Sequence, residues 1–305
     1  MILDFHTHTF PDKIALRALE GMSAVSHARY FTNGTRQALS ASMRESGVDW
    51  SLNLPVCTRA DQVAKINHTL AEQAEALKAA HIVTFGGMHP ACPDPAPQLR
   101  FLQENGIRGI KLHPAYQGTA LTDPAMLRII GLASELDLAV LVHAGVDIGF
   151  PERNFASVPM ILRVLREVRP TRLILAHMGG WQAWDEVERE LAGAPVFLDT
   201  AYSLGPVPMT VPPETVRWPR NMTPERFARL ARAHGTERVL FGTDSPWTDQ
   251  GESLRLLRET PLTEREKARI LWRNGAALLG LTASAEGTEP NHESSEINER
   301  MTPFP

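Results

Sequence analysis

Eight short apolar runs recur along the chain, and each is followed by a longer segment with helical spacing. The runs cover residues 1–5, 50–56, 82–86, 107–112, 139–142, 173–176, 196–198 and 239–241. Strands that alternate with helices in this way are typical of strand–helix units around a parallel sheet. Eight units in succession predict an α/β fold of the (β/α)8 TIM-barrel type, whose usual size of about 250 residues is compatible with this chain.

The segments between the runs are predicted to be helices on the outside of this barrel. They cover residues 36–46, 61–80, 96–105, 123–136, 158–168, 182–191, 224–233 and 253–258. In one of them, Val63, Ile66 and Leu70 fall at three- and four-residue steps, while Lys65 and Glu72 lie off this stripe. The spacing directs one apolar face toward the sheet and the charged side chains toward water.

The chain after the eighth run divides into a helix and a polar tail. A helix predicted over 264–279 begins with a Thr263-Glu-Arg-Glu capping box and closes the domain near Gly280. Residues 282–305 are rich in Glu, Ser, Asn and Pro and lack the apolar content that offsets ordering entropy, so a disordered tail is expected. Residues 1–281 are therefore predicted to form a single domain.

Composition narrows the partners that we expect. The formal net charge is −4, which argues against the basic surface of a nucleic-acid-binding protein. Cys57 and Cys92 are too few for a disulfide framework, and neither a signal peptide nor a membrane-spanning apolar run is recognisable. We expect a cytoplasmic protein with reduced thiols and a small-molecule substrate, with no nucleic acid or membrane partner, and a homodimer is compatible with the sequence.

Histidine and aspartate side chains follow four of the apolar runs at the point where each run ends. His6 and His8 follow the first run, His143 the fifth, His177 the sixth and Asp244 the eighth. The carboxyl ends of barrel strands form the active face, and residues two apart on a strand point the same way. Three imidazoles and a carboxylate suit Zn²⁺ or a similar cation and leave a position for water. The sequence therefore predicts a metal and catalytic centre at this face.

Each of these residues has a structural alternative when it is taken alone. A single His-x-His pair is weak evidence because surface histidines pair by chance. A histidine that ends an apolar run, such as His143, is more often a buried group with satisfied hydrogen bonds than a metal ligand. These alternatives weaken because five such residues fall together at strand ends.

Six motifs give the chain a resemblance to a known family. Separately only the first and the fifth are unusual, but together they are specific. They read Asp4-Phe-His-Thr-His-Thr, Gly109-Ile-Lys-Leu-His-Pro, Leu141-Val-His-Ala-Gly, Leu175-Ala-His-Met-Gly-Gly, Phe241-Gly-Thr-Asp-Ser-Pro-Trp and Asn274-Gly-Ala-Ala-Leu-Leu-Gly. Over residues 1–281 the sequence resembles the amidohydrolase superfamily, and within it the amidohydrolase-related branch that includes proteins similar to aminocarboxymuconate semialdehyde decarboxylase.

The resemblance implies that His6, His8 and His143 bind one divalent metal ion. Asp244 is implied as a further ligand, or as a close neighbour that takes a proton from water, and His177 as the group that polarises the substrate or stabilises developing charge. Zn²⁺ is the first expectation, and Mn²⁺, Fe²⁺ and Co²⁺ suit the same ligands. A bound Zn²⁺ lowers the pKa of water from about 15.7 to about 7, so the implied chemistry uses a metal-activated water.

Lys111, in the fourth run, has two states in this superfamily. A carboxylated lysine would bridge two metal ions, whereas an ammonium would bind a substrate carboxylate. The branch that the chain resembles is typically mononuclear, so one ion and an ammonium are expected. His113, His89 and Trp247 follow strands and are candidates to contact the substrate, although structural roles remain open for them. The proline-rich segment 203–221 is predicted to be a loop over the active-site mouth.

Two further carboxylates lie near the predicted centre in the sequence. Asp199 ends the seventh run and could bind substrate, anchor the second nitrogen of an imidazole, or cap the following loop. Asp4 precedes His6 by two residues and is expected to be structural. Phe150 and Tyr202 follow strands and are candidates to wall a pocket.

Three functions follow from this set of residues. The first is hydrolysis of a small carboxylated ester, lactone or amide by a metal-activated water. The second is non-oxidative decarboxylation of an aromatic or unsaturated carboxylic acid by the same ligand set. The third is a metal-binding barrel that no longer catalyses, against which the retention of every ligand type together with His177 and Asp244 argues.

Overall fold

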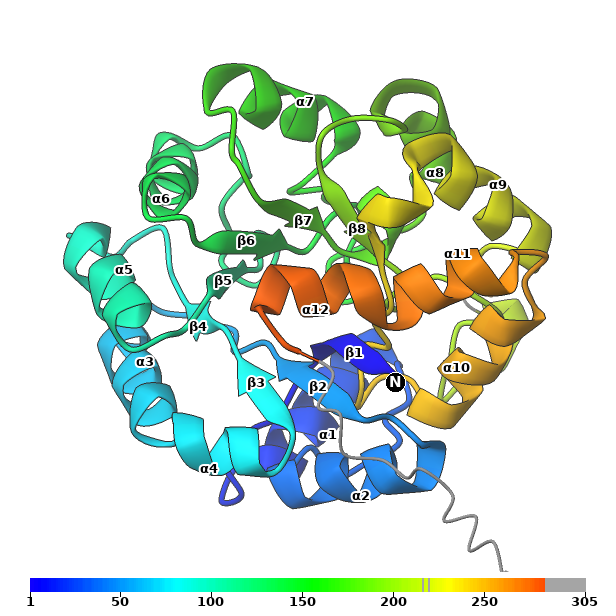
Figure 1. The fold of residues 1–305 in the computed structure, drawn as a ribbon, viewed down its shortest axis with the longest axis horizontal. Coiled ribbons are helices and arrows are strands. Elements are labelled where there is room, and N and C mark those ends of the chain that lie inside the picture. The colour runs from blue at the N-terminus through cyan, green and yellow to red at the C-terminus, as the bar shows by residue number, and fades with distance from the viewer. Residues whose placement is uncertain (216, 219, 283–305) are drawn as a thin grey trace, which may run out of the picture.

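The computed structural model of the chain describes residues 1–215, 217–218 and 220–282 (Figure 1). Short parallel strands lie at its centre and helices surround them. The tail that was expected to be disordered, 282–305, lies outside the described residues except for its first position.

Nine strand segments in the described residues form two parallel sheets, in which consecutive strands are always adjacent. The sheet orders are β1-β2-β3 and β4-β5-β6-β7-β8-β9. The segments are β1 (Leu3–Thr7), β2 (Trp50–Asn53), β3 (Ile82–Thr84), β4 (Gly86–Gly87), β5 (Gly109–Leu112), β6 (Ala139–Val142), β7 (Leu173–Leu175), β8 (Phe197–Asp199) and β9 (Val239–Leu240). Only Phe85 separates β3 from β4, so these two segments are one interrupted strand and the barrel has eight strand positions, as the sequence predicted.

Backbone hydrogen bonds join the first strand to the chain that follows the last one. The N–H of Phe5 donates to the carbonyl of Phe241 at 2.7 Å, and the N–H of Asp244 donates to the carbonyl of His6 at 2.8 Å. A third bond runs from the N–H of His8 to the carbonyl of Ser245 at 2.7 Å. These bonds close the ring, and the predicted (β/α)8 barrel is confirmed.

Twelve α-helices of the described residues surround the strands, and six of them begin at a side-chain cap. The oxygens of Thr35, Asp94, Asp123, Thr223, Asp249 and Thr263 accept backbone N–H groups of the first helical turn. The helices are α1 (Ala15–Ser26), α2 (Arg36–Ser46), α3 (Gln62–Glu72), α4 (Ala74–Ala79), α5 (Pro95–Glu104), α6 (Pro124–Glu135), α7 (Val158–Glu167), α8 (Trp184–Glu186), α9 (Pro224–His234), α10 (Gln250–Glu259), α11 (Glu264–Ala268) and α12 (Asn274–Leu279). No described helix is both long and apolar enough to cross a membrane.

Three predicted helices are interrupted, and one helix was not predicted. The segment 61–80 divides into α3 and α4, while π turns continue α8 and connect α11 to α12. Helix α1 was missed because its pattern is weak: it has no side-chain cap, and Leu16 and Val25 are 48% and 70% exposed. Only three of its residues are buried, so no apolar stripe marks the helix in the sequence.

The C-terminal helix closes the end of the barrel where the strands begin, as expected. Thr263 and Glu266 form the predicted capping box at its start. Figure 1 shows α11 and α12 crossing the middle of the strand ring. Gly275 lies against Leu3 and Phe5 so closely that a Cβ atom there would come within 2.9 Å of both side chains. The opposite end, where the strands finish, is left for the active site.

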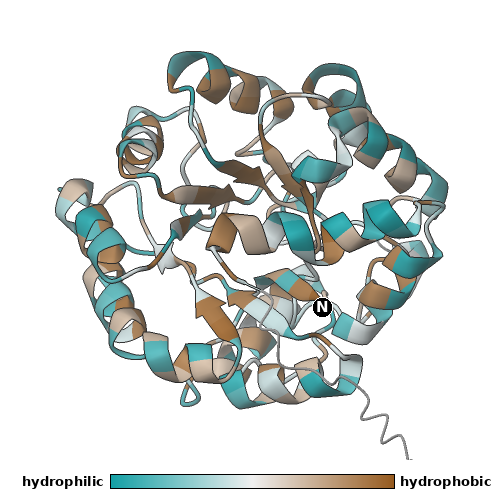
Figure 2. Ribbon diagram, viewed as in Figure 1, coloured by the Kyte–Doolittle hydropathy of each residue, from teal (hydrophilic) through white to brown (hydrophobic). Residues whose placement is uncertain are grey.

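Alternation along the strands separates an inner core from an outer one. In β6, Ala139 and Leu141 belong to the cluster inside the barrel, whereas Val140 and Val142 pack toward the helices. Figure 2 accordingly shows apolar strands at the centre and polar residues on the outer helix faces. Burial of each large apolar side chain contributes about 1.5–3 kcal/mol. The alternation also makes His143, two residues after Leu141, the next inward position.

Candidate active site

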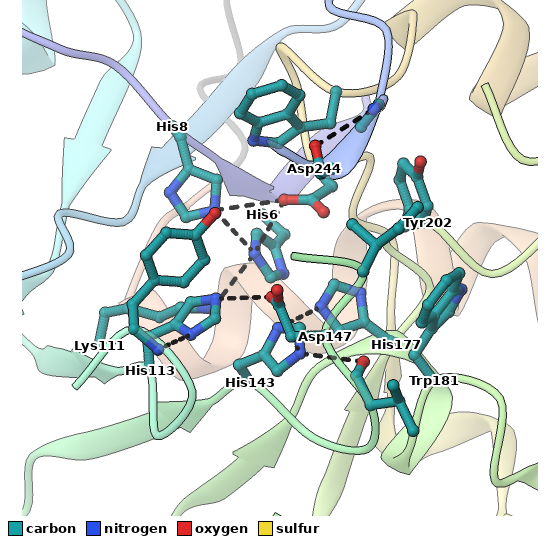
Figure 3. A pocket seen from close by; sticks show the side chains of 16 residues that line it. His6, His8, Lys111, His113, His143, Asp147, His177, Trp181, Tyr202 and Asp244 are labelled. Atoms are coloured by element: carbon teal, nitrogen blue, oxygen red, sulfur yellow. Dashed lines mark hydrogen bonds and ion pairs between the residues drawn. The ribbon is translucent and has the colours of Figure 1, made fainter. Parts of the chain in front are cut away.

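A cavity at the carboxyl ends of the strands gathers most of the residues singled out in the sequence (Figure 3). His89 is not among the residues that line it: this side chain is buried elsewhere, and its Nδ1 accepts the N–H of Ala91 at 3.1 Å. Trp247 and Tyr202 line the cavity, whereas Phe150 does not and is 40% exposed. The predicted residues in the lining are His6, His8, Lys111, His113, His143, His177, Asp244, Trp247 and Tyr202.

His6 and His8 reach the cavity because the register of β1 shifts. Leu3 and Phe5 point into the barrel core, and the pairing of β1 with β2 slips between Asp4 and Thr7. A slip of this kind changes which face a side chain takes. Both histidines therefore line the cavity beyond the core, while Asp4 turns toward Thr243 and Gln250, whose side chains donate to its carboxylate at 2.6 and 2.7 Å. Asp4 is structural, as expected.

The second ring nitrogens of His6 and His8 fix how these histidines face the cavity. His6 Nδ1 lies 2.8 Å from Asp199 Oδ2, and His8 Nδ1 lies 2.7 Å from the carbonyl of Leu54. A carboxylate and a carbonyl accept hydrogen bonds, so each Nδ1 carries the proton of a neutral imidazole. The Nε2 atoms are left with free lone pairs. Burial lowers the pKa of His6 well below its usual range, and Lys111 lowers it further, so this imidazole is neutral.

The two free Nε2 atoms meet the carboxylate of Asp244. His6 Nε2 and His8 Nε2 lie 3.2 Å apart, and Asp244 Oδ1 lies 3.4 and 3.2 Å from them. We call His6, His8 and Asp244 the first cluster. Burial raises the pKa of Asp244, whereas positive charge on His6, His8 and His177 would lower it by more; when these rings are neutral, a bound cation would supply this charge instead. Three acceptors that converge without a proton between them fit a divalent cation.

His143 and His177 form a second pair of facing acceptors. His177 Nδ1 donates to the carbonyl of Ala201 at 2.8 Å, and His143 Nε2 donates to the carbonyl of Val146 at 3.3 Å. The remaining nitrogens, His143 Nδ1 and His177 Nε2, face one another at 3.0 Å with a lone pair each. The resemblance implied that His143 binds a metal ion together with His6 and His8. In the structure the nearest ring nitrogen to His143 Nδ1 is instead that of His177, at 3.0 Å. A cation or a proton between these two nitrogens would remove their repulsion.

Lys111 lies between these groups and is almost completely buried. Its Nζ atom is 3.3 Å from His6 Nε2 and its exposed fraction is 1%. Burial lowers the pKa of Lys111 to about 8, while the carboxylates of Asp199, Asp244 and Asp147 oppose this shift. At pH 7 most of the lysine is thus an ammonium, and it donates to the lone pair of His6 Nε2 when no cation is bound there.

Asp199 connects the first cluster to His177. One carboxylate oxygen accepts His6 Nδ1, and the other accepts the backbone N–H groups of His177 and Ala201 at 3.0 and 3.1 Å. The side chain is fully buried, and burial raises its pKa to about 6. Asp199 therefore anchors an imidazole, which is one of the roles that its place at the end of β8 suggested.

Several cavity residues have left-handed backbone conformations. The φ angles of His177, Tyr202 and Asp244 are 59°, 53° and 71°. Residues other than glycine seldom adopt positive φ, and each instance costs about 1–3 kcal/mol that the surrounding structure must offset. Strain of this kind concentrates at functional sites. Its recurrence at three lining residues agrees with the assignment of this cavity as the active site.

Seven lining residues were missed in the sequence, and Asp147 and Tyr116 are the two among them that can ionise. Asp147 lies in the loop after β6, four residues beyond His143, and Tyr116 lies in the turn after His113. Neither residue ends a strand, so the rule that located the other residues does not reach them. The only signal in the sequence was the closeness of Asp147 to His143, and its meaning depends on the shape of the loop.

Comparison with known proteins places the chain. A family model described as Amidohydrolase matches residues 3–281, and no curated protein sequence matches the chain. Among solved structures it is similar to IDCase of Metarhizium anisopliae, with 18% identity and a TM-score of 0.66 over 92% of this chain and 97% of that one. It is also similar to 2,6-dihydroxybenzoate decarboxylase from Rhizobium, with 13% identity and a TM-score of 0.64 over 92% and 98%.

A third similar structure contains a metal ion. This structure, 5-carboxyvanillate decarboxylase from Novosphingobium aromaticivorans complexed with manganese, has 13% identity and a TM-score of 0.65 over 92% of this chain and 96% of that one. At these identities the likenesses concern the fold, whereas the family match covers nearly the whole chain. The chain therefore belongs to the amidohydrolase family and is a metal-dependent enzyme built on a TIM barrel.

Proposed function

We propose that the protein is a metal-dependent hydrolase of a small carboxylated ester, lactone or amide. One observation carries the proposal: three unprotonated acceptors, His6 Nε2, His8 Nε2 and Asp244 Oδ1, converge at a cavity that the ammonium of Lys111 also lines. We propose Zn²⁺ at the first cluster, with Mn²⁺ as the next choice. A divalent cation bound there would polarise a water molecule and a substrate carbonyl and so supply a nucleophile near neutral pH.

Asp244 is proposed as the base. A cation bound by His6 and His8 would keep its carboxylate ionised, and its backbone is held by the bond from Asp244 N–H to the His6 carbonyl. A fixed, ionised carboxylate at the cavity can accept a proton from water during attack and return it to the leaving group. No rearrangement of the first cluster is needed for this transfer.

His177 faces the other imidazoles with the ring nitrogen that makes no bond to the backbone. Its Nδ1 bonds to the carbonyl of Ala201, and its Nε2 faces His143 Nδ1 at 3.0 Å. Such a ring can hold a cation or accept a proton, and it can stabilise negative charge only after it is protonated. We propose that His177 either accepts a proton in the reaction or, together with His143, holds a second cation.

The state of Lys111 determines whether His177 accepts a proton or holds a second cation, because the two states of Lys111 imply different numbers of metal ions. As an ammonium it would bind a substrate carboxylate, and its charge would disfavour a second cation nearby. As a carboxylated side chain it would be an anion between the first cluster and His177. We propose the ammonium, and elemental analysis of purified protein tests it: about one ion per chain supports this state, whereas about two ions would show that Lys111 is carboxylated.

Decarboxylation is the second candidate, and a specific observation favours it. Solved structures with a similar fold include decarboxylases of aromatic acids. Tyr116, Trp181, Tyr202 and Trp247 give this cavity aromatic walls that suit a flat acid. In this reaction Lys111 and the cation would orient the carboxylate, and Asp244 would take up a proton from solvent and pass it to the carbon atom that loses CO2.

Product analysis separates the two reactions. Metal-loaded protein is incubated with small carboxylated esters, lactones and amides, and separately with hydroxybenzoic acids, in water labelled with oxygen-18. Label in the acid product, loss of activity on chelation and recovery with Zn²⁺ or Mn²⁺ would support hydrolysis. Release of CO2 without incorporation of label would replace it by decarboxylation. The exposed variant His68→Ala is the matched control for histidine substitutions at the centre.

A further inference from the structure

Asp147 is a buried carboxylate that the proposed hydrolysis does not use. It lies in the loop between β6 and α7, and its exposed fraction is 6%. Its Oδ1 accepts the N–H of Gly149 at 2.8 Å, and its carbonyl accepts the N–H of Phe150 at 2.9 Å. This tight turn holds the carboxylate in place, and Figure 3 shows it directed toward the centre of the site.

The second oxygen of Asp147 has no close partner in the described residues. Oδ2 lies 3.6 Å from both His113 Nε2 and His143 Nε2, beyond hydrogen-bond distance. No lysine or arginine of the described chain lies within 4.0 Å of this carboxylate. Lys111 acts on this carboxylate only from beyond contact distance, so in the described residues Oδ2 has neither a hydrogen-bond donor nor an adjacent cation to compensate its desolvation.

A metal ion is a poor occupant of this position, although His113, His143 and Asp147 lie close enough to bind one. The rings of the two histidines are stacked, with centroids 4.2 Å apart and an angle of 19° between the planes. An imidazole binds a metal along a lone pair in its own plane, and the planes of stacked rings do not converge on one point. Moreover, His143 Nε2 donates to Val146, and His113 Nδ1 accepts the N–H of Tyr116 at 3.4 Å, which leaves the proton on its Nε2.

The occupant must therefore bring its own proton. An ammonium or another N–H donor satisfies Oδ2 of Asp147 and supplies the missing positive charge. Tyr116 lines the same part of the cavity, edge-on to the His113 ring at 4.5 Å, and an aromatic wall suits an organic cation. Lys111 lines the same cavity with the opposite charge. A molecule that carries both a carboxylate and an ammonium would complement both side chains.

We infer that Asp147 determines specificity by binding an ammonium group of the substrate, so that the substrate is an amino-acid derivative with a free carboxylate. The inference rests on the proposed function in one respect: the reactive group of this substrate is taken to be an ester, lactone or amide. Asp147 would bind the substrate away from the scissile bond, and its removal would weaken binding of the ammonium without displacing the metal ion.

Matched pairs of unreactive probes test this inference on the metal-loaded protein. Calorimetry would compare 4-aminobutanoate with butanoate, and β-alanine with propanoate. We expect the ammonium to improve affinity about 10- to 100-fold in at least one pair, as for a hydrogen bond between charged groups. Asp147→Asn should abolish this preference while leaving the affinity for the plain acid within about 2-fold. Glu152→Gln, an exposed acid of the same loop, is the matched control and should retain the preference.

Other outcomes would overturn the inference. If wild-type protein shows no preference for either ammonium probe, or binds none of the four probes, Asp147 does not recognise an ammonium. If Asp147→Asn loses metal, Asp147 acts as a positioning residue for His143 instead. Asp147→Ser provides the same comparison should the asparagine variant fail to fold. Because the probes do not react, their binding is independent of hydrolysis. A clear ammonium preference in a protein that hydrolyses none of the esters, lactones and amides would contradict the proposed function and leave this inference intact.

Discussion

Two groups of histidine and aspartate side chains border the same cavity, and they have the same composition but different geometry. In the first cluster the rings of His6 and His8 are 71° apart, and their Nδ1 protons point away to Asp199 and Leu54. Around Asp147 the rings of His113 and His143 are nearly parallel, and their Nε2 atoms carry protons but lie 3.6 Å from the carboxylate, beyond hydrogen-bond distance. Each imidazole has one nitrogen bonded to the surrounding protein and one that faces the cavity. The partner of the first nitrogen therefore decides whether the second offers a lone pair or a proton.

The most severe test of this comparison removes the lone pairs of the first cluster. The double variant His6→Ala and His8→Ala should contain no bound metal and show no activity, because only one of the three converging ligands remains. Elemental analysis and circular dichroism would check metal content and folding. Stoichiometric metal in a folded double variant would mean that the cation lies elsewhere.

A smaller loss is expected when the charge of the first cluster is removed and its shape is kept. Asp244→Asn should lower kcat by about 10² to 10⁴-fold, the contribution typical of a general base. The two histidines should still retain metal, although with lower affinity. Steady-state kinetics at saturating metal measure the effect, and an unchanged kcat would remove Asp244 from the mechanism.

The partner of the first nitrogen can be tested directly at His6. Asp199→Asn should weaken metal affinity about 10- to 100-fold, because the amide no longer stabilises the proton on Nδ1. Titration of the metal-free protein with Zn²⁺ measures the change. Asp199→Glu should recover part of the affinity if the carboxylate is what matters, and equal affinities in all three proteins would contradict the role assigned to Asp199.

The smallest effect is expected in the second group. His113→Gln should leave the metal content unchanged, because the ring nitrogen that faces Asp147 carries a proton rather than a lone pair. Elemental analysis beside the wild type is the measurement. A fall of one ion per chain in this variant would show that His113, His143 and Asp147 bind a metal despite their stacked rings.

Much of the barrel could be predicted from the sequence, because parallel strands buried on both faces read as apolar runs. The end of each apolar run also marks the end of a strand, so the residues that follow these runs could be assigned to the active face. Pairing geometry could not be predicted in this way. The register shift in β1, which brings His6 and His8 to one cavity, leaves no trace in the order of residues, and helix α1 lacks the buried stripe that would have marked it.

The sequence located many of the residues that line the cavity, but not the way in which they group. His143 and Asp244 both line the cavity, yet they belong to different sets of contacts. The sequence shows which residues end strands, whereas the grouping depends on which ring nitrogen carries a proton. That choice is made by carbonyl groups such as those of Leu54 and Val146, and the positions of carbonyl groups depend on loop geometry.

The bonds of Asp199 have a consequence for how such a centre can change over evolutionary time. One oxygen serves the ring of His6, and the other serves the backbone of His177. A substitution at this position would alter both halves of the centre in a single step. Lineages that gain or lose a metal ion would therefore have to keep Asp199 and vary the residues around it, whereas the loop that carries Asp147 is free to diversify with the substrate.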